Sequence, residues 1–231
     1  MSKIKSIQED IREAPAYSIG EAADYLRLPK STLRAWVLGQ RYGKEKRLLF
    51  KAVIAIADRE DRRLSFINLV EAFVLDGIRR EHNVPLPTVR KAVEYLRRTF
   101  KTQRPLAEEQ FETDGVDLFV DKFGALVGAS QEGQLQMREI IRERLKRVIR
   151  DPSGVAQKIV LFPMRDRNGK GSVVLDPRFS FGRPVLDGYA LRTAIVSERF
   201  QAGEKIEDLA RDYGVSPDAV ENAIRCERRA A

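Results

Sequence analysis

The side chains that most often catalyse reactions or bind metals are scarce in this chain of 231 residues. It has one histidine, His82, and one cysteine, Cys226, so an internal disulfide and a cysteine-based zinc site are excluded. We therefore expect no enzymatic activity, no cofactor and no bound metal. The enzyme alternative is a metal nuclease, but its candidate ligands are scattered, without a clustered acidic motif or a histidine partner. They are Asp114, Asp117, Asp121, Asp151 and Asp166.

The number and spacing of the Lys and Arg residues indicate a binding site for a negatively charged ligand. From Arg27 to Arg63 the chain has eleven Lys and Arg against four Asp and Glu, a local net charge of +7, whereas the whole chain carries +8. Such a concentration is the electrostatic signature of a site for nucleic-acid phosphates. The predicted DNA-binding residues are Lys30, Ser31, Arg34, Arg41, Lys44, Lys46 and Arg47.

Two short helices are predicted to position these cations. Ser18 and Glu21 have the spacing of a capping box, in which each side chain bonds to the backbone amide of the other residue. A first helix should therefore begin near Ser18. Pro29 should end it, because the residue before a proline is pushed out of helical geometry, and the same proline can begin the next helix.

The second helix should present the cations to solvent. Leu33, Trp36 and Val37 recur at three- and four-residue spacing and must face the first helix, which leaves Lys30, Ser31 and Arg34 outside. Gly43 can turn a basic hairpin after it, so the unit is predicted to be a winged helix-turn-helix that enters the major groove of DNA. The alternative is a three-helix domain with a solvated basic loop.

The sequence pattern in the middle of the chain predicts a small α+β unit in a mainly α-helical protein. Ser65 should cap an amphipathic helix, and a second should follow Pro87. Short apolar runs broken by glycines between residues 111 and 128 are typical of strands and turns, and residues 134–150 predict a helix. Residues 159–162 and 173–175 predict strands. The glycines at 169 and 171 resemble a phosphate loop, but Met164 replaces its first glycine, so a hairpin turn is favoured.

The end of the chain predicts a second helix-turn-helix pattern with the opposite charge. Helices are expected at residues 194–200, 206–213 and 217–226. From Glu198 to Glu227 there are eight acids and four bases, a local net charge of −4. Phosphates would repel this unit, so we expect a protein-binding or dimerising domain. The predicted domains are residues 1–63, 64–104, 105–175 and 176–231.

Several segments resemble a known family. Residues 176–188, 198–204 and 209–216 resemble a helical domain of unknown function that is associated with antitoxins, and residues 32–36 and 64–71 resemble a MerR-like helix-turn-helix that precedes it in longer members. The chain is thus similar to VapB-type antitoxins. The resemblance implies a bifunctional protein that binds its operator, represses its own operon and masks a PIN-like ribonuclease toxin.

The resemblance also bears on the position of a toxin-binding site. The segment between Met164 and Pro184 is strongly cationic, and a guanidinium can pair with a carboxylate that would otherwise hold the metal of a nuclease. The expected toxin-binding residues are Arg165, Arg167, Arg178 and Arg183. The alternative is that these arginines are solvated or form structural ion pairs.

The remaining expectations concern assembly and location. A homodimer is expected because bacterial operators are commonly palindromic, with residues 65–100 or the acidic C-terminal domain as the interface. The polar first 16 residues and the lack of a long apolar run predict no signal peptide, no membrane span and a cytoplasmic protein. The alternative function is a MerR-like transcription factor with a ligand-sensing middle domain and no toxin partner.

Overall fold

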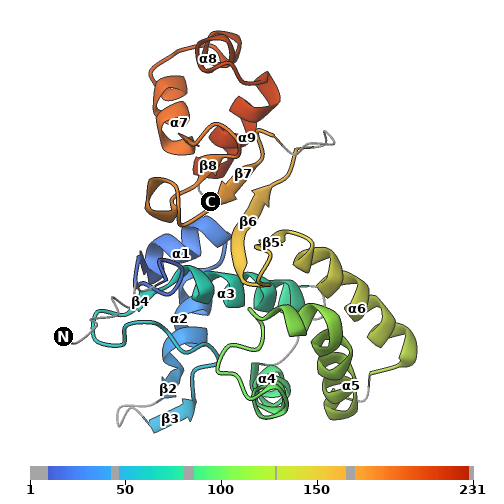
Figure 1. The fold of residues 1–231 in the computed structure, drawn as a ribbon. Helices are drawn as coiled ribbons and strands as arrows, with labels where there is room; N and C mark the ends of the chain where they lie inside the picture. Colours follow the sequence, from blue (N-terminus) through green and yellow to red (C-terminus); the bar gives the residue numbers. More distant parts are fainter. Residues whose placement is uncertain (1–9, 43–46, 81–85, 128, 165–169, 229–231) are drawn as a thin grey trace, which may run out of the picture.

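The computed structural model describes residues 10–42, 47–80, 86–127, 129–164 and 170–228. Figure 1 shows two groups of helices at opposite ends of the molecule, connected by a narrow β-sheet. The described residues are mainly helical and their strands pair antiparallel, which confirms the predicted fold class. Among these residues, no helix is long and apolar enough to cross a membrane.

The N-terminal unit begins as the sequence predicts. Ser18 Oγ accepts a hydrogen bond of 3.1 Å from the Glu21 amide, and the Glu21 carboxylate accepts one of 3.0 Å from the Ser18 amide. The capping box is therefore confirmed. Arg27, with φ of 55°, ends the first helix before Pro29. The elements are β1 (Tyr17–Ser18), α1 (Ile19–Leu26), α2 (Lys30–Leu38), β2 (Gln40–Tyr42), β3 (Arg47–Phe50) and β4 (Arg63–Leu64).

Helix α3 (Phe66–Arg80) lies at the centre of the molecule. It packs against α1, α6, β4 and β6, and every residue from Phe66 to Ile78 is buried. Its predicted cap is confirmed, because Ser65 Oγ accepts a hydrogen bond of 3.2 Å from the Asn68 amide. The other helices of this group are α4 (Leu86–Phe100), α5 (Val116–Val127) and α6 (Gln131–Leu145).

The prediction of strands and turns between residues 111 and 128 is wrong. A π-helical turn, Phe111–Gly115, leads into α5, whose apolar residues at helical spacing are buried against α4 and α6. Gly115 permits close packing here, because a Cβ atom on it would lie 2.7 Å from Phe111 Cδ2 and 3.0 Å from Phe100 Cε2. A glycine that indicates a turn in the sequence therefore marks a tight helix contact in the fold.

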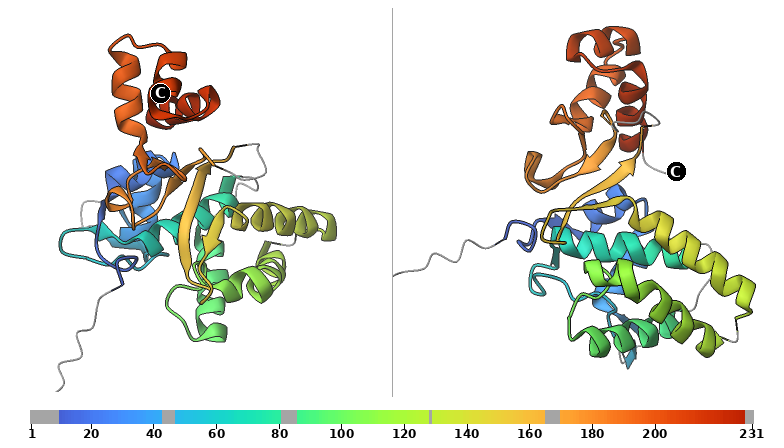
Figure 2. Two further views of the ribbon diagram at one scale, coloured as in Figure 1. Left: turned by 45° about the horizontal axis from the view of Figure 1, so that its top comes forward. Right: turned by 45° about the vertical axis from the view of Figure 1, so that its right-hand side comes forward.

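A five-stranded antiparallel sheet joins the two groups of helices (Figure 2). Its order follows the sequence: β5 (Val148–Arg150), β6 (Ala156–Phe162), β7 (Val173–Leu175), β8 (Val185–Leu186) and β9 (Leu191–Arg192). The helix predicted for residues 134–150 therefore ends earlier, since Val148 pairs with Ile159 in the sheet. The boundary predicted after residue 175 falls inside the sheet, so we propose that the sheet and the last helices form one unit.

The last three helices agree with the sequence. They are α7 (Thr193–Gln201), α8 (Ile206–Tyr213) and α9 (Pro217–Glu227). Gly214, with φ of 62°, ends α8, and Ser216 Oγ accepts a hydrogen bond of 3.2 Å from the Ala219 amide to cap α9. Figure 1 places these helices, coloured orange to red, at the end of the molecule opposite the β2–β3 hairpin.

A buried carboxyl group in α3 makes the stability of this fold depend on pH. Glu71 is 1% exposed and accepts a hydrogen bond of 3.2 Å from the side-chain amide of Asn68. Burial raises the pKa of the Glu71 carboxyl from 4.5 to about 8, although Asn68 and the charge of Arg97 lower it. Between these pH values the folded chain holds a proton that the unfolded chain releases, so stability falls as pH rises.

We expect Glu71→Gln to remove this loss of stability at higher pH, because glutamine stays neutral and keeps an oxygen that accepts the hydrogen bond from Asn68. Between pH 5.5 and 7.5 the free energy of unfolding of the natural chain should fall, relative to the variant, by about 1 kcal/mol per pH unit. Urea denaturation of both proteins across this range measures the difference. Parallel stability curves for the two proteins would contradict it.

Candidate nucleic-acid interface

Helix α2 has one buried face and one exposed cationic face. Leu33, Trp36 and Val37 are at most 4% exposed and pack toward α1 and the core. Lys30, Ser31 and Arg34 are exposed on the opposite face, as predicted. Lys30 also forms an ion pair with Asp24 of α1, with 3.3 Å between Nζ and Oδ2. The structure thus brings together three of the seven predicted DNA-binding side chains on one helix face.

The β2–β3 hairpin follows α2 directly and is fixed to it. The Trp36 carbonyl accepts hydrogen bonds from the amides of Val53 and Ile54, just after β3, at 2.8 and 3.1 Å. Arg41 and Arg47 lie on the two strands, where Tyr42 pairs with Arg47. Lys44 and Lys46 lie outside the described residues. The position of the hairpin beside the C-terminal end of α2 is that of a wing.

A groove beside α2 adds a cation that the sequence analysis missed. The groove has a volume of about 510 Å³, and its lining includes Ser31, Arg34 and Gln40 together with Arg79 of α3. The Arg79 guanidinium lies 5.5 Å from the centre of the Trp36 ring. The sequence pattern placed the helix after Ser65 in a core or in a dimer interface, whereas the proximity of Arg79 to α2 follows from the packing of α3.

The opposite side of the unit is joined to the sheet and the last domain. The Tyr17 hydroxyl donates a hydrogen bond of 3.1 Å to the Gly182 carbonyl, and Arg12 pairs with Asp151 at 2.6 Å. Burial raises the pKa of the Tyr17 phenol well above its usual value, so the hydroxyl stays protonated as a donor. These contacts join β1 and α1 to the rest of the molecule, and Figure 1 places α2 and the hairpin on the side of α1 away from the last three helices.

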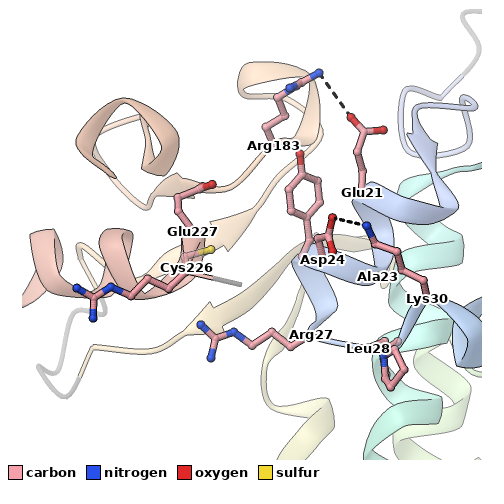
Figure 3. A pocket seen from close by; sticks show the side chains of 12 residues that line it. Glu21, Ala23, Asp24, Arg27, Leu28, Lys30, Arg183, Cys226 and Glu227 are labelled. Atoms are coloured by element: carbon pink, nitrogen blue, oxygen red, sulfur yellow. Dashed lines mark ion pairs between the residues drawn. The ribbon is translucent and has the colours of Figure 1, made fainter. Parts of the chain in front are cut away.

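A cleft of about 660 Å³ lies where α1 meets α9 (Figure 3). Its charged lining has both signs, since it includes Glu21, Asp24, Arg27 and Arg183. Cys226 also lines it, but burial raises the pKa of its thiol to about 12, which leaves the thiol protonated and unreactive. No cluster of three or more His, Cys, Asp or Glu side chains that could hold a metal ion occurs in the described part of the chain.

The two described members of the predicted toxin-binding set lie on one loop and pair within the chain. Arg178 forms an ion pair of 2.6 Å with Asp176, which is 2% exposed. Arg183 lies 3.7 Å from the carboxylate of Glu21 in α1. Both arginine side chains remain 49% exposed, whereas Arg165 and Arg167 fall outside the described residues.

The second helix pair, α8 and α9, has the shape of a helix-turn-helix but an acidic outer surface. Asp218 and Glu221 are exposed on α9, and Glu207 and Asp208 are exposed on α8. Carboxylates on these faces repel phosphates, which favours a protein ligand over DNA for this unit.

The fold and the cationic face of α2 together define a helix-turn-helix DNA-binding protein. A family model described as "Putative DNA-binding HTH domain" matches residues 15–93, and one described as "Protein of unknown function (DUF433)" matches residues 173–225. The first covers α1, α2, the hairpin and α3, and the second covers the sheet from β7 and most of the last three helices.

Relatives with similar sequences span nearly the whole chain. "Putative antitoxin VapB45" of Mycobacterium tuberculosis is 30% identical and covers 92% of this chain and 93% of its own length. "Uncharacterized protein Rv2308" of the same organism is 25% identical over 90% of this chain and 88% of its own length. The chain belongs to the VapB45 antitoxin family.

A solved structure has the same architecture. The crystal structure of Rv2018 from Mycobacterium tuberculosis matches with a TM-score of 0.68 and 28% identity, over 91% of this chain and 98% of that one. The arrangement of a helix-turn-helix unit, a central helical group and a C-terminal domain is therefore shared with an experimentally determined fold.

We expect Arg34→Ala to lower the dependence of DNA affinity on salt. Arg34 is exposed on α2, and each phosphate contact that is lost should reduce the slope of log affinity against log salt by about one. The measurement is a titration of a DNA duplex from the region upstream of the gene at several salt concentrations. Arg211→Ala on α8 is the control, because Arg211 is also exposed and its ion pair is with nearby Asp208 on the same helix. Equal slopes in all three proteins would exclude Arg34 from the interface.

Proposed function

We propose that this protein is the antitoxin of a type II toxin–antitoxin system. It binds operator DNA through α2 and the hairpin, represses its own operon, and neutralises a PIN-like ribonuclease toxin by direct protein binding. The supporting observation is that the chain has two candidate binding surfaces, the cationic face of α2 and the loop between β7 and β8. The β2–β3 hairpin lies at the end of the molecule opposite the last three helices (Figure 1). Binding of DNA and binding of a protein partner are therefore assigned to different surfaces of one chain.

The proposal that the protein binds DNA is supported by the local charge and by the geometry of α2. Lys30, Ser31 and Arg34 are presented by a helix whose other face is buried, so they keep a fixed spacing as they meet the groove. Arg41, Lys44, Lys46 and Arg47 of the wing complete the proposed set. A cytoplasmic location follows from this function, because operator DNA lies in the bacterial cytoplasm.

The proposed toxin-binding half includes the loop that carries Arg178 and Arg183. Half of each guanidinium side chain is exposed although both have carboxylate partners within the chain. Arg178 also neutralises the buried Asp176, so its removal would leave an unpaired buried carboxylate and disturb the fold. Arg183 is the better residue for a test, since its partner Glu21 is 38% exposed and remains solvated without it.

We expect Arg183→Glu to weaken capture of the toxin by about tenfold or more, because the substitution reverses a charge in the proposed interface. The assay is co-expression with the protein encoded by the adjacent reading frame, followed by pull-down and titration of the purified proteins. Arg211→Glu, on the outer face of α8, is the matched charge reversal. A natural chain that captures no adjacent gene product would contradict the toxin-binding half, and equal capture by both variants would exclude Arg183.

We also infer a homodimer, since one recognition helix reads only a half-site and a palindromic operator matches a two-fold axis. Light scattering at micromolar concentration should give about twice the chain mass of 26.3 kDa. A mass of one chain, both alone and with DNA, would contradict the dimer.

A transcription factor that senses a small molecule is the second candidate function. The observation that favours it is the cleft between α1 and α9, which has room for a small ligand beside the DNA-binding unit. This position differs from the middle domain that the sequence indicated. Thermal stabilisation by small charged ligands, together with failure to bind the adjacent gene product, would favour the sensor.

A further inference from the structure

The loop between β7 and β8 presents a large aromatic side chain to solvent. Phe181 is 89% exposed, and Phe179, two residues before it, is 43% exposed. Single exposed apolar residues are common on proteins, but an almost fully exposed phenylalanine beside a second exposed one is not explained by folding. Aromatic side chains of this kind are enriched in the centres of protein interfaces.

The backbone of this loop is held in a conformation that its side chains disfavour. Ser180, Phe181 and Gly182 have successive φ values of 49°, 55° and 74°, in the left-handed region that bulky residues rarely occupy. Only the last of them is a glycine, and a Cβ atom there would lie 1.8 Å from the Tyr17 hydroxyl. Such conformations persist where surrounding contacts enforce them, and they cluster at functional sites.

Hydrogen bonds on both sides of Phe181 supply that enforcement. The Gly182 carbonyl accepts from the Tyr17 hydroxyl at 3.1 Å, and the Gly182 amide donates to the Phe179 carbonyl at 2.8 Å. The Arg178 guanidinium donates to the buried Asp176 carboxylate at 2.6 Å. The loop is therefore fixed before any partner arrives, which lowers the entropy cost of binding.

An apolar recess lies next to the exposed aromatic pair. It has a volume of about 280 Å³ and a mainly apolar lining of Val174, Phe179, Val185, Leu186, Asp187, Gly188, Tyr189 and Ala190. An apolar cavity of about 150 Å³ is enough to bind benzene, so this recess can take one apolar side chain of a partner. Phe181 does not fill it, since its own side chain is almost fully exposed.

The charges around the recess select the kind of partner. Arg178 is 49% exposed with its guanidinium 5.6 Å from the centre of the Phe179 ring, and Lys170 is exposed with its Nζ atom 4.5 Å from the centre of the Tyr189 ring. The neighbouring acids are less available, because Asp176 is buried and Asp187 pairs with Lys158 at 2.5 Å. A second copy of this chain would set cation against cation across a two-fold axis, whereas an acidic surface would be attracted.

We propose that the Phe181 face is the docking site for an acidic protein partner. This face consists of Phe179, Phe181, Arg178, Lys170 and the recess. The partner inserts an apolar side chain into the recess, receives Phe181 in an apolar pocket of its own, and pairs carboxylates with Arg178 and Lys170. This inference rests on the proposed function, in which the partner is the toxin, and it places the aromatic pair at the centre of the interface with the two cations at its rim.

The variant Phe181→Asn tests the proposal with little risk to the fold. Asparagine tolerates the left-handed conformation better than phenylalanine does, so the melting temperature should stay equal or rise. Binding of the purified protein from the adjacent reading frame should weaken at least 30-fold, the loss typical of a central interface residue. Binding of operator DNA should be unchanged.

Leu135→Gln is the matched control, because Leu135 is 56% exposed on α6 and lies outside this face. It should bind the partner as the natural chain does. If the natural chain binds no partner, the proposed function fails and this inference fails with it. If the natural chain binds and Phe181→Asn binds equally well, only this inference is overturned. The same conclusion follows if Phe181→Asn changes the mass of the chain in light scattering while partner binding is retained, since the face would then join two copies.

Discussion

The burial of α3 on all sides is the constraint on which the rest of the structure depends. Helix α3 packs against the DNA-binding unit through α1 and β4, against the helical group through α6, and against the sheet through β6. Its buried polar residues Asn68 and Asp76 have bonding partners within the fold. Asn68 accepts from the Ala57 amide and donates to the Ala55 carbonyl, which fixes the segment after the hairpin, and Asp76 pairs with Arg144 of α6 at 3.0 Å.

The loop before β8 packs directly on the DNA-binding unit. The Tyr17 hydroxyl and the Glu21 carboxylate contact this loop, and Lys30 of α2 lines the same cleft as Arg183. The loop therefore contacts the DNA-binding unit through Gly182 and Arg183 and exposes Phe181 to solvent.

The composition alone does not show which cations are available to a ligand and which are structural. The excess of cations lies mainly in one segment, but several arginines elsewhere are structural. Arg147 donates to the carbonyls of Val160 and Leu161, and Arg150 donates to backbone carbonyls of Ala107, Glu108 and Gly154. These guanidinium groups tie the helical group to the sheet because an arginine can satisfy several carbonyl acceptors at once. Counting cations along the sequence therefore overstates the number that are available to a ligand.

Features that depend on residues a few positions apart could be predicted from the sequence. The capping box of Ser18 and Glu21, the cap at Ser216, the bounds of α8 and the exposed face of α2 all follow from local hydrogen bonds and from helical spacing. Features that depend on contacts between distant residues could be seen only in the folded structure. Gly115 makes a tight helix contact with Phe100 and Phe111, Arg79 lines the groove beside α2 because α3 is packed there, and the Tyr17 hydroxyl bonds to Gly182 beside the exposed Phe181. Local sequence patterns do not indicate such contacts, since the residues involved are far apart in the sequence and meet only when the chain folds.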